Sequence, residues 1–162
     1  MAKEDRKTLE QLLDGTLPWP ETHRIMSSFK APGRFEQMLA ILQERVPWDE
    51  TILLPFGENL FIVQRADGAR VAKCWCGHEF GDYRENWKLS ALIFVRDTPE
   101  KMDEIYPAMM SSDPEWMELR EFYCPSCRRQ LEVEAVPPGY PVLQDFQPDL
   151  ETFYREWLGK EL

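Results

Sequence analysis

The chain has 162 residues, of which 43% are hydrophobic and 30% charged, and its formal net charge at pH 7 is −10. This length and composition fit one globular domain and exclude a disordered chain. The acidic charge disfavours nucleic acid and anionic membranes as partners. No stretch approaches the roughly 18 apolar residues of a membrane-spanning helix. The first seven residues lack the apolar region of a secretion signal, so we expect a cytoplasmic protein.

Residues 1–46 are predicted to form a helical N-terminal segment. Pro18 and Pro20 indicate a break between two helical pieces, because proline interrupts the hydrogen bonding of a helix interior. The second piece follows Pro32 and carries apolar residues at helical spacing, namely Phe35, Met38, Leu39, Leu42 and Val46.

Residues 51–136 are predicted to form a β-rich core. Strands are expected at 51–55, 60–65, 69–73, 89–95 and 130–136, with residues 115–123 ambiguous between helix and strand. The turn at 66–68 joins the second and third strands as a hairpin. Thr98 and Pro99 should begin a helix that reaches about Tyr106. In the last strand Leu131, Val133 and Ala135 alternate with glutamates, which predicts a half-exposed strand.

Residues 137–162 are predicted to form an extended arm followed by a helix. Four prolines between Pro137 and Pro148 disfavour pairing in a sheet. Asp149 can cap a final helix whose apolar face carries Leu150, Phe153, Tyr154 and Trp157. The predicted fold class is therefore α+β, as a single domain over 1–162. It contains a small antiparallel β core with a zinc-ribbon-like four-cysteine site, a helical N-terminal segment, a proline-rich arm and a C-terminal helix.

The only four cysteines form two close pairs, Cys74-Trp75-Cys76 and Cys124-Pro125-Ser126-Cys127. Two thiol pairs about fifty residues apart are typical of a structural zinc site with four thiolate ligands. Four thiolates would fill the coordination sphere and leave no position at which the metal could activate water. We therefore predict Cys74, Cys76, Cys124 and Cys127 as zinc ligands, with His78 outside the coordination sphere.

Two alternatives to a zinc site stay open at this stage. Cys124 and Cys127 could form a redox disulfide, although the βαβ context of such motifs is missing. The cysteines could also be unpaired buried thiols. No phosphate-binding loop, nucleophile motif or metalloprotease motif is present, and the exposed carboxylates are typical of solvated surfaces. No catalytic and no cofactor-binding residue is predicted.

Six tryptophans are a high count for a chain of this length, and most of them lie beside proline or charged residues. Tryptophan is enriched at the energetic centres of protein interfaces. The set favours a chain that lies against a partner protein, although any single tryptophan could equally be a half-buried anchor.

Six segments spread over residues 41–159 resemble the gamma subunit of the acetone carboxylase and acetophenone carboxylase family. They are Ile41–Asp49, Leu60–Gln64, Asn86–Ser90, Val95–Pro99, Glu104–Pro107 and Phe153–Gly159.

This resemblance implies a subunit of a heteromeric, ATP-dependent ligase that forms a C–C bond by carboxylating acetone or acetophenone to a β-keto acid. It implies alpha-type and beta-type large subunits, similar to hydantoinases, that hold ATP and a divalent metal. It also implies a zinc-binding, non-catalytic role for the gamma subunit, which braces the large subunits. The family's zinc cysteines fall on Cys74, Cys76, Cys124 and Cys127.

Two departures from the acetone-type pattern favour an aryl-ketone branch. Gly81 stands where a further cysteine is expected, and Arg128 stands where glycine commonly follows the second pair. A stand-alone zinc-ribbon adaptor that mediates protein contacts is the alternative function. A small metal-dependent or thiol-dependent enzyme is a third hypothesis.

Overall fold

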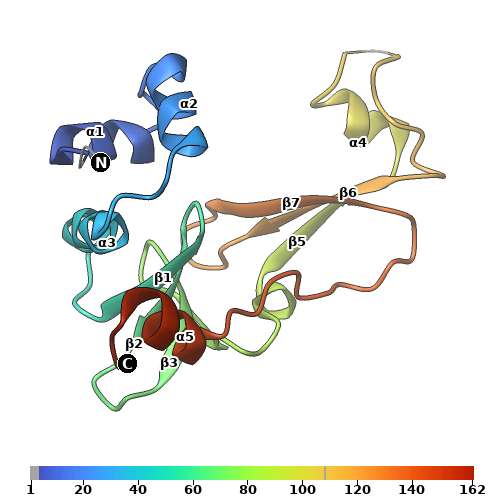
Figure 1. Ribbon diagram of the computed structural model, residues 1–162. Helices are drawn as coiled ribbons and strands as arrows, with labels where there is room; N and C mark the ends of the chain where they lie inside the picture. Colours follow the sequence, from blue (N-terminus) through green and yellow to red (C-terminus); the bar gives the residue numbers. More distant parts are fainter. Residues whose placement is uncertain (1–3, 108) are drawn as a thin grey trace.

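The computed structural model describes residues 4–107 and 109–162. It contains two small antiparallel sheets that lie end to end, with three helices at one end of the molecule and a projecting loop at the other (Figure 1). This architecture confirms the predicted α+β class.

The N-terminal segment forms three helices rather than two, α1 (Arg6–Leu13), α2 (Trp19–Ser27) and α3 (Arg34–Arg45). The predicted break lies between α1 and α2, where Pro18 is the N-cap of α2 and Pro20 lies in its first turn, but α2 itself was not predicted. A proline is tolerated in the first turn of a helix, where its missing N–H would have no partner in the helix.

Sheet A contains the strands β1 (Thr51–Gly57), β2 (Leu60–Gln64), β3 (Arg70–Cys74) and β4 (Glu79–Asp82), in that spatial order. The first three were predicted to within about two residues, including the hairpin between β2 and β3. Strand β2 is almost entirely buried, since α3 packs on one face of the sheet and the C-terminal helix on the other. Strand β4 was not predicted, because only Phe80 is buried in it and Gly81 lies within it at a φ of 105°.

Sheet B contains β5 (Leu92–Arg96), β6 (Glu118–Tyr123) and β7 (Gln130–Val136), in that spatial order. The short 3₁₀ helix η1 (Trp87–Ser90) precedes β5, so the predicted strand at 89–95 starts too early. Helix α4 (Pro99–Asp103) is shorter than predicted, although the backbone N–H of Tyr106 still bonds to Met102 O. The ambiguous segment before the second cysteine pair is strand β6.

One core cluster joins the two sheets. The rings of Phe80 from sheet A, Trp87 from η1 and Phe122 from sheet B form a chain of edge-on contacts with centroid distances of 5.7 and 6.0 Å. Cys74 and Cys124 lie in the same cluster with no exposed area. The junction of the sheets is therefore built from large rings and from the residues of the two cysteine pairs.

The side-chain pattern of β7 follows its alternation only in part. Leu131 is buried in the core, as the alternation suggests, but Val133 is 48% exposed and Glu134 is half-buried beside the ammonium of Lys88. The apolar alternation was correct as a sign of a strand, but it does not identify the buried side chains in the middle of that strand. There, charge pairing with a buried lysine turns a glutamate inward.

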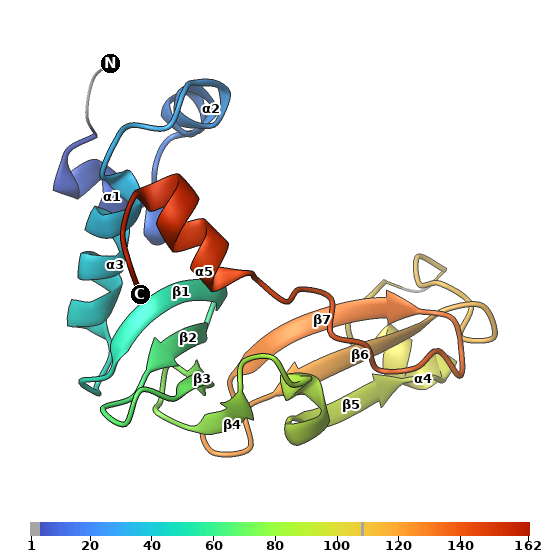
Figure 2. The same cartoon turned by 60° about the horizontal axis from the view of Figure 1, so that its bottom comes forward.

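The segment 137–148 has no helix or strand and runs back along sheet B towards sheet A (Figure 2). Side chains outside the arm hold its backbone: Asn86 Nδ2 donates to Val142 O over 3.0 Å, and Arg120 Nη2 donates to Tyr140 O over 2.5 Å. The arm leads to α5 (Leu150–Thr152), capped by Asp149 as predicted, and to the π-helical turn η2 (Phe153–Leu158). Trp157 in η2 is 74% exposed, so it does not belong to the buried face predicted for the C-terminal helix.

Lys88 is the electrostatic anchor of the arm. Its ammonium is almost fully buried, lies 2.6 Å from Glu132 and 3.0 Å from Glu134, and contacts Asp145 of the arm. Burial alone would lower the pKa of Lys88, but hydrogen bonds to the three carboxylates hold that pKa above its ordinary value. Asp145, in turn, has a pKa lowered by its bond to Lys88.

Replacing Lys88 by methionine should therefore destabilise the protein, because it leaves neighbouring carboxylates without their cation. We expect a loss of about 2–3 kcal/mol in urea unfolding at pH 7, somewhat less than for a fully buried pair, since Asp145 is open to solvent. Because the pKa of Lys88 is raised, the ion pairs of Lys88 stabilise the fold at all pH values below about 10. Because the pKa of Asp145 is lowered, its pair with Lys88 persists down to about pH 4. The loss should thus be constant from about pH 6 to 9.

Lys160→Met is the matched control, because Lys160 pairs with Glu36 over 3.1 Å at the surface. Its cost should stay within about 0.5 kcal/mol. Equal costs for the two variants would show that the buried cluster does not hold the arm.

Candidate metal centre

The first cysteine pair lies in the tight turn between β3 and β4. The N–H of Cys74 donates to His78 O, and the N–H of Gly77 donates to Cys74 O, both over 2.8 Å. Gly77 has a φ of 97°, a conformation that side chains rarely adopt. Strand β3 ends at Cys74, and Cys76 belongs to the turn. The turn still directs both sulfurs to the same place.

The second pair lies in the turn between β6 and β7. The N–H of Arg128 donates to Cys124 O, and the N–H of Cys124 donates to Arg129 O, both over 3.0 Å. Arg128 has a φ of 62°, in the left-handed region that favours glycine. The chain thus keeps the usual turn shape with arginine in place of glycine and accepts the local strain.

The four sulfur atoms converge where the two turns meet. The Sγ atoms of Cys74 and Cys127 lie 3.8 Å apart, and those of Cys76 and Cys124 lie 3.7 Å apart. All four lie within 4.8 Å of one another. Sulfurs that bind one tetrahedral zinc ion at about 2.3 Å are separated by about 3.8 Å. The arrangement is compatible with a metal site, and all four cysteines are free thiols in the structure.

The protonation of the four thiols depends on their surroundings. Burial raises the pKa of Cys74 and that of Cys124. Burial also acts to raise the pKa of Cys76, but hydrogen bonds from the His78 backbone and from the neighbouring thiols outweigh it and lower this pKa to about 7. Four thiolates at these separations would repel one another without a cation. A bound divalent cation would replace the protons and stabilise the thiolate forms.

Side chains around the sulfurs clamp the two turns together. The guanidinium of Arg129, from the second turn, lies 4.6 Å from the ring centroid of Trp75 in the first, and it donates to Asn59 Oδ1 over 2.9 Å. Trp48 Nε1 donates to Trp75 O over 3.0 Å. Sequence reasoning missed this clamp, because no local pattern indicates that Arg129 near one cysteine pair stacks on the tryptophan inside the other.

His78 does not belong to the sulfur cluster. Its ring packs edge-on against Phe80 with a centroid distance of 4.9 Å, and it is absent from the groups of potential ligands among the described residues. Its backbone carbonyl, not its imidazole, serves the site by accepting the Cys74 N–H.

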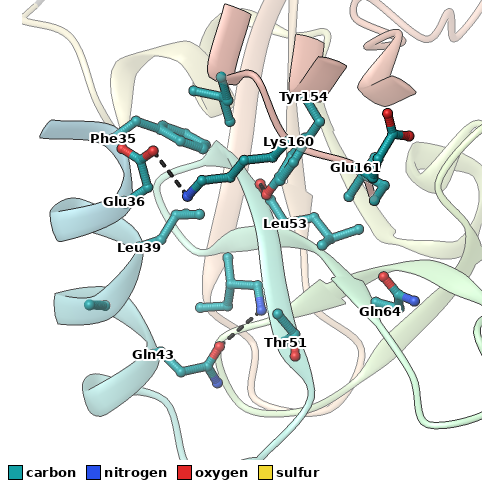
Figure 3. Close-up of a pocket in the computed structure, with 14 residues that line it drawn as sticks. Phe35, Glu36, Leu39, Gln43, Thr51, Leu53, Gln64, Tyr154, Lys160 and Glu161 are labelled. Atoms are coloured by element: carbon teal, nitrogen blue, oxygen red, sulfur yellow. Dashed lines mark hydrogen bonds and ion pairs between the residues drawn. The ribbon is translucent and has the colours of Figure 1, made fainter. Parts of the chain in front are cut away.

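An open hollow of about 410 Å³ lies between α3, β1 and the C-terminal residues (Figure 3). Several of its polar groups are engaged by other protein groups. Gln43 Oε1 accepts the Ile52 N–H over 2.9 Å, and Lys160 pairs with Glu36 at the rim. Its walls are otherwise largely apolar, and no group of catalytic type converges in it. The hollow therefore supplies no second candidate for chemistry.

The sequence of this chain is similar to those of known carboxylase subunits. Residues 46–158 match the family model described as the acetone carboxylase gamma subunit. The chain is 49% identical over 155 residues to the acetone carboxylase gamma subunit of Xanthobacter autotrophicus (strain ATCC BAA-1158 / Py2), covering 95% of this chain and 92% of the relative. It is 34% identical over 79 residues to the acetophenone carboxylase beta subunit of Aromatoleum aromaticum (strain DSM 19018 / LMG 30748 / EbN1), covering 48% and 61%.

The turn geometry predicts opposite effects of two substitutions beside the cysteines. Gly77→Ala should lower the free energy of unfolding by about 1–2 kcal/mol, because alanine is strained at positive φ. Its Cβ would also lie 3.4 Å from Trp48 Cδ1. Arg128→Gly should leave stability unchanged or raise it by up to about 1 kcal/mol, because glycine relieves the strain.

Urea unfolding of the two variants, each with its metal content measured, checks this prediction. A Gly77→Ala variant as stable as the parent chain would contradict the strained-turn account. So would an Arg128→Gly variant with a clear loss of stability.

Proposed function

The chain belongs to the acetone carboxylase gamma subunit family, and from this premise we propose that it is a non-catalytic, zinc-binding subunit of a heteromeric, ATP-dependent ketone carboxylase. In this role it braces large hydantoinase-like subunits of alpha and beta type. The observation that carries the proposal is the 49% identity to an acetone carboxylase gamma subunit over 95% of the chain.

Zinc at Cys74, Cys76, Cys124 and Cys127 is supported by the chemistry and the spacing of the four sulfurs. Thiolates select zinc over magnesium or calcium, and the sulfur separations fit a tetrahedron. The four residues would hold the ion from the ends of both sheets. When bound, zinc would supply charge neutralisation and a crosslink. ATP and a further divalent metal belong to the large subunits in this proposal.

A bracing role is supported by the amount of apolar surface that the chain exposes. Trp19, Trp116 and Trp157 are 67, 79 and 74% exposed, on three separate elements. Exposed tryptophans with neighbouring apolar side chains are typical of surfaces that become buried in a complex. The expectation of partner-facing tryptophans thus fits three of the six, while Trp87 is buried in the core.

Acetone is the ketone that we propose. The departures at Gly81 and Arg128 favour an aryl-ketone branch, but the identity values favour acetone: 49% over most of the chain, compared with 34% over about half of it. Arg128 also proves compatible with the turn, so its presence carries little weight.

The alternative is a stand-alone zinc-ribbon adaptor, which would use the same metal site without a carboxylase.

Among the described residues, no helix combines the length and apolar character required to cross a membrane. Reduced, metal-binding thiols are typical of the cytoplasm, and we propose this location for either function.

The proposed metal predicts one zinc ion per chain, visible by native mass spectrometry. Cys124→Ser should abolish zinc binding and unfold the region around both sheets, since structural zinc contributes roughly 10–16 kcal/mol of apparent binding free energy in small metal domains. Ser126→Ala changes the same turn without removing a thiol and should retain both zinc and stability. A verified metal-free chain with unchanged thermal stability would contradict the structural role.

The proposed partners predict that the tagged chain co-purifies in fixed stoichiometry with the large carboxylase subunits encoded in the same genome. The assembled complex should carboxylate acetone with ATP, and the isolated chain should show no turnover. If the isolated chain stays soluble and monomeric and has no measurable affinity for those subunits, the adaptor function is favoured instead.

A further inference from the structure

A cluster of exposed apolar side chains lies at the end of sheet B that is distant from the cysteines. It belongs to the connection from α4 to β6, and we call it the methionine tip. Met109, Trp116 and Met110 are 100, 79 and 72% exposed. Figure 1 shows this part of the chain, in yellow, projecting from the sheet at the end opposite α1–α3. The full set is Ile105, Tyr106, Met109, Met110, Trp116 and Met117.

The base of the tip is firmly held. Arg96 donates to Lys101 O over 2.6 Å, to Glu104 over 2.7 Å and to the buried Glu121 over 2.8 Å. Met102, the buried residue of α4, has no exposed area. The fold therefore fixes α4 on sheet B and presents the apolar side chains beyond it to solvent. A surface of this kind, supported by a buried ion pair, is suited to binding a partner.

Acidic side chains surround the tip. Glu100, Asp103, Asp113 and Glu115 are exposed carboxylates, and Lys101, the one basic residue between positions 97 and 117, is paired with Asp97 over 2.5 Å. An apolar centre with an acidic rim is complementary to an apolar pocket with a basic rim. Anionic membranes and nucleic acid do not fit this rim, because they carry the same sign of charge. A second copy of the chain also has a net charge of −10 and would repel the first.

We propose that the methionine tip inserts into an apolar, basic-rimmed pocket on a large carboxylase subunit and is the main anchor of the gamma subunit. This inference rests on the proposed function. Trp116 would supply the large rigid contact, and the methionines would adapt to the shape of the pocket. The carboxylates of the rim would speed the approach of the two proteins and fix their orientation.

The test compares full-length variants with the parent chain by surface plasmon resonance on the purified large subunits encoded in the same genome. The double variant Met110→Ala with Trp116→Ala should weaken binding about 30-fold or more, mainly through faster dissociation. Leu89→Ala is the control, since it removes a 69% exposed apolar side chain of η1 and should change the affinity less than 3-fold. Trp19→Ala tests α2 as a competing anchor.

The rim is tested separately through the salt dependence of association. The double variant Asp103→Lys with Glu115→Lys should associate about 10-fold more slowly at 50 mM NaCl and lose most of the salt dependence of the parent chain. Glu58→Lys, an exposed carboxylate far from the tip, serves as control. Circular dichroism and zinc content should be unchanged in every variant.

The outcomes separate this inference from the proposed function. If the parent chain does not bind the large subunits, the proposed function fails. If the parent chain binds and the tip variants bind equally well, only the tip is overturned. Loss of affinity in Trp19→Ala but not in Trp116→Ala would assign the anchor to α2. If the parent chain associates with itself and the tip variants do not, the partner of the methionine tip is a second copy of the chain and not a large subunit.

Discussion

The contact between two short turns, one between β3 and β4 and the other between β6 and β7, determines how the two sheets lie against each other. Among the described residues the two sheets share no pairing of strands, so their relative position is set by side chains at the junction. Those side chains are the four cysteines, the ring chain from Phe80 to Phe122, and the stacking of Arg129 on Trp75. The rings and the stacked arginine hold the two turns together, but neither would offset the repulsion that would arise if all four thiols, which lie within 4.8 Å of one another, were ionised. A cation among the sulfurs is the element that would make the junction stable.

The sequence was most informative where a local rule decides the structure. Paired cysteines predicted the metal-type cluster, proline density predicted the arm, and the turn around Asp67 predicted the hairpin of β2 and β3. It was least informative where tertiary charge pairing decides. Glu134 is turned inward towards Lys88, which lies 46 residues earlier in the chain, and towards Arg120. No local pattern contains that pairing. The clamp by Arg129 was missed for the same reason, since stacking across two turns appears only when both are placed.

The junction of the two sheets and the exposed apolar surfaces have different roles. The junction of the sheets is closed, aromatic and compatible with a metal, whereas the large exposed side chains lie on α2, on the methionine tip and in η2. Around Trp19 and Trp116 other large apolar side chains are exposed as well, among them Phe29 and Met110, and such groups are typical of contact surfaces. Together with membership of the acetone carboxylase gamma subunit family, this division supports a rigid core that holds contact surfaces in fixed positions. The arm belongs to the core in this account, because Lys88 fixes it to sheet B.

In the function proposed above, one metal ion bound by all four cysteines joins the two sheets. X-ray absorption at the zinc edge of the protein in complex with its large subunits tests this claim most directly. The account predicts a single shell of four sulfur scatterers at about 2.3 Å, with no nitrogen or oxygen in that shell. A shell with fewer sulfurs and an imidazole or water ligand, or a complex whose gamma subunit holds no metal, would contradict it.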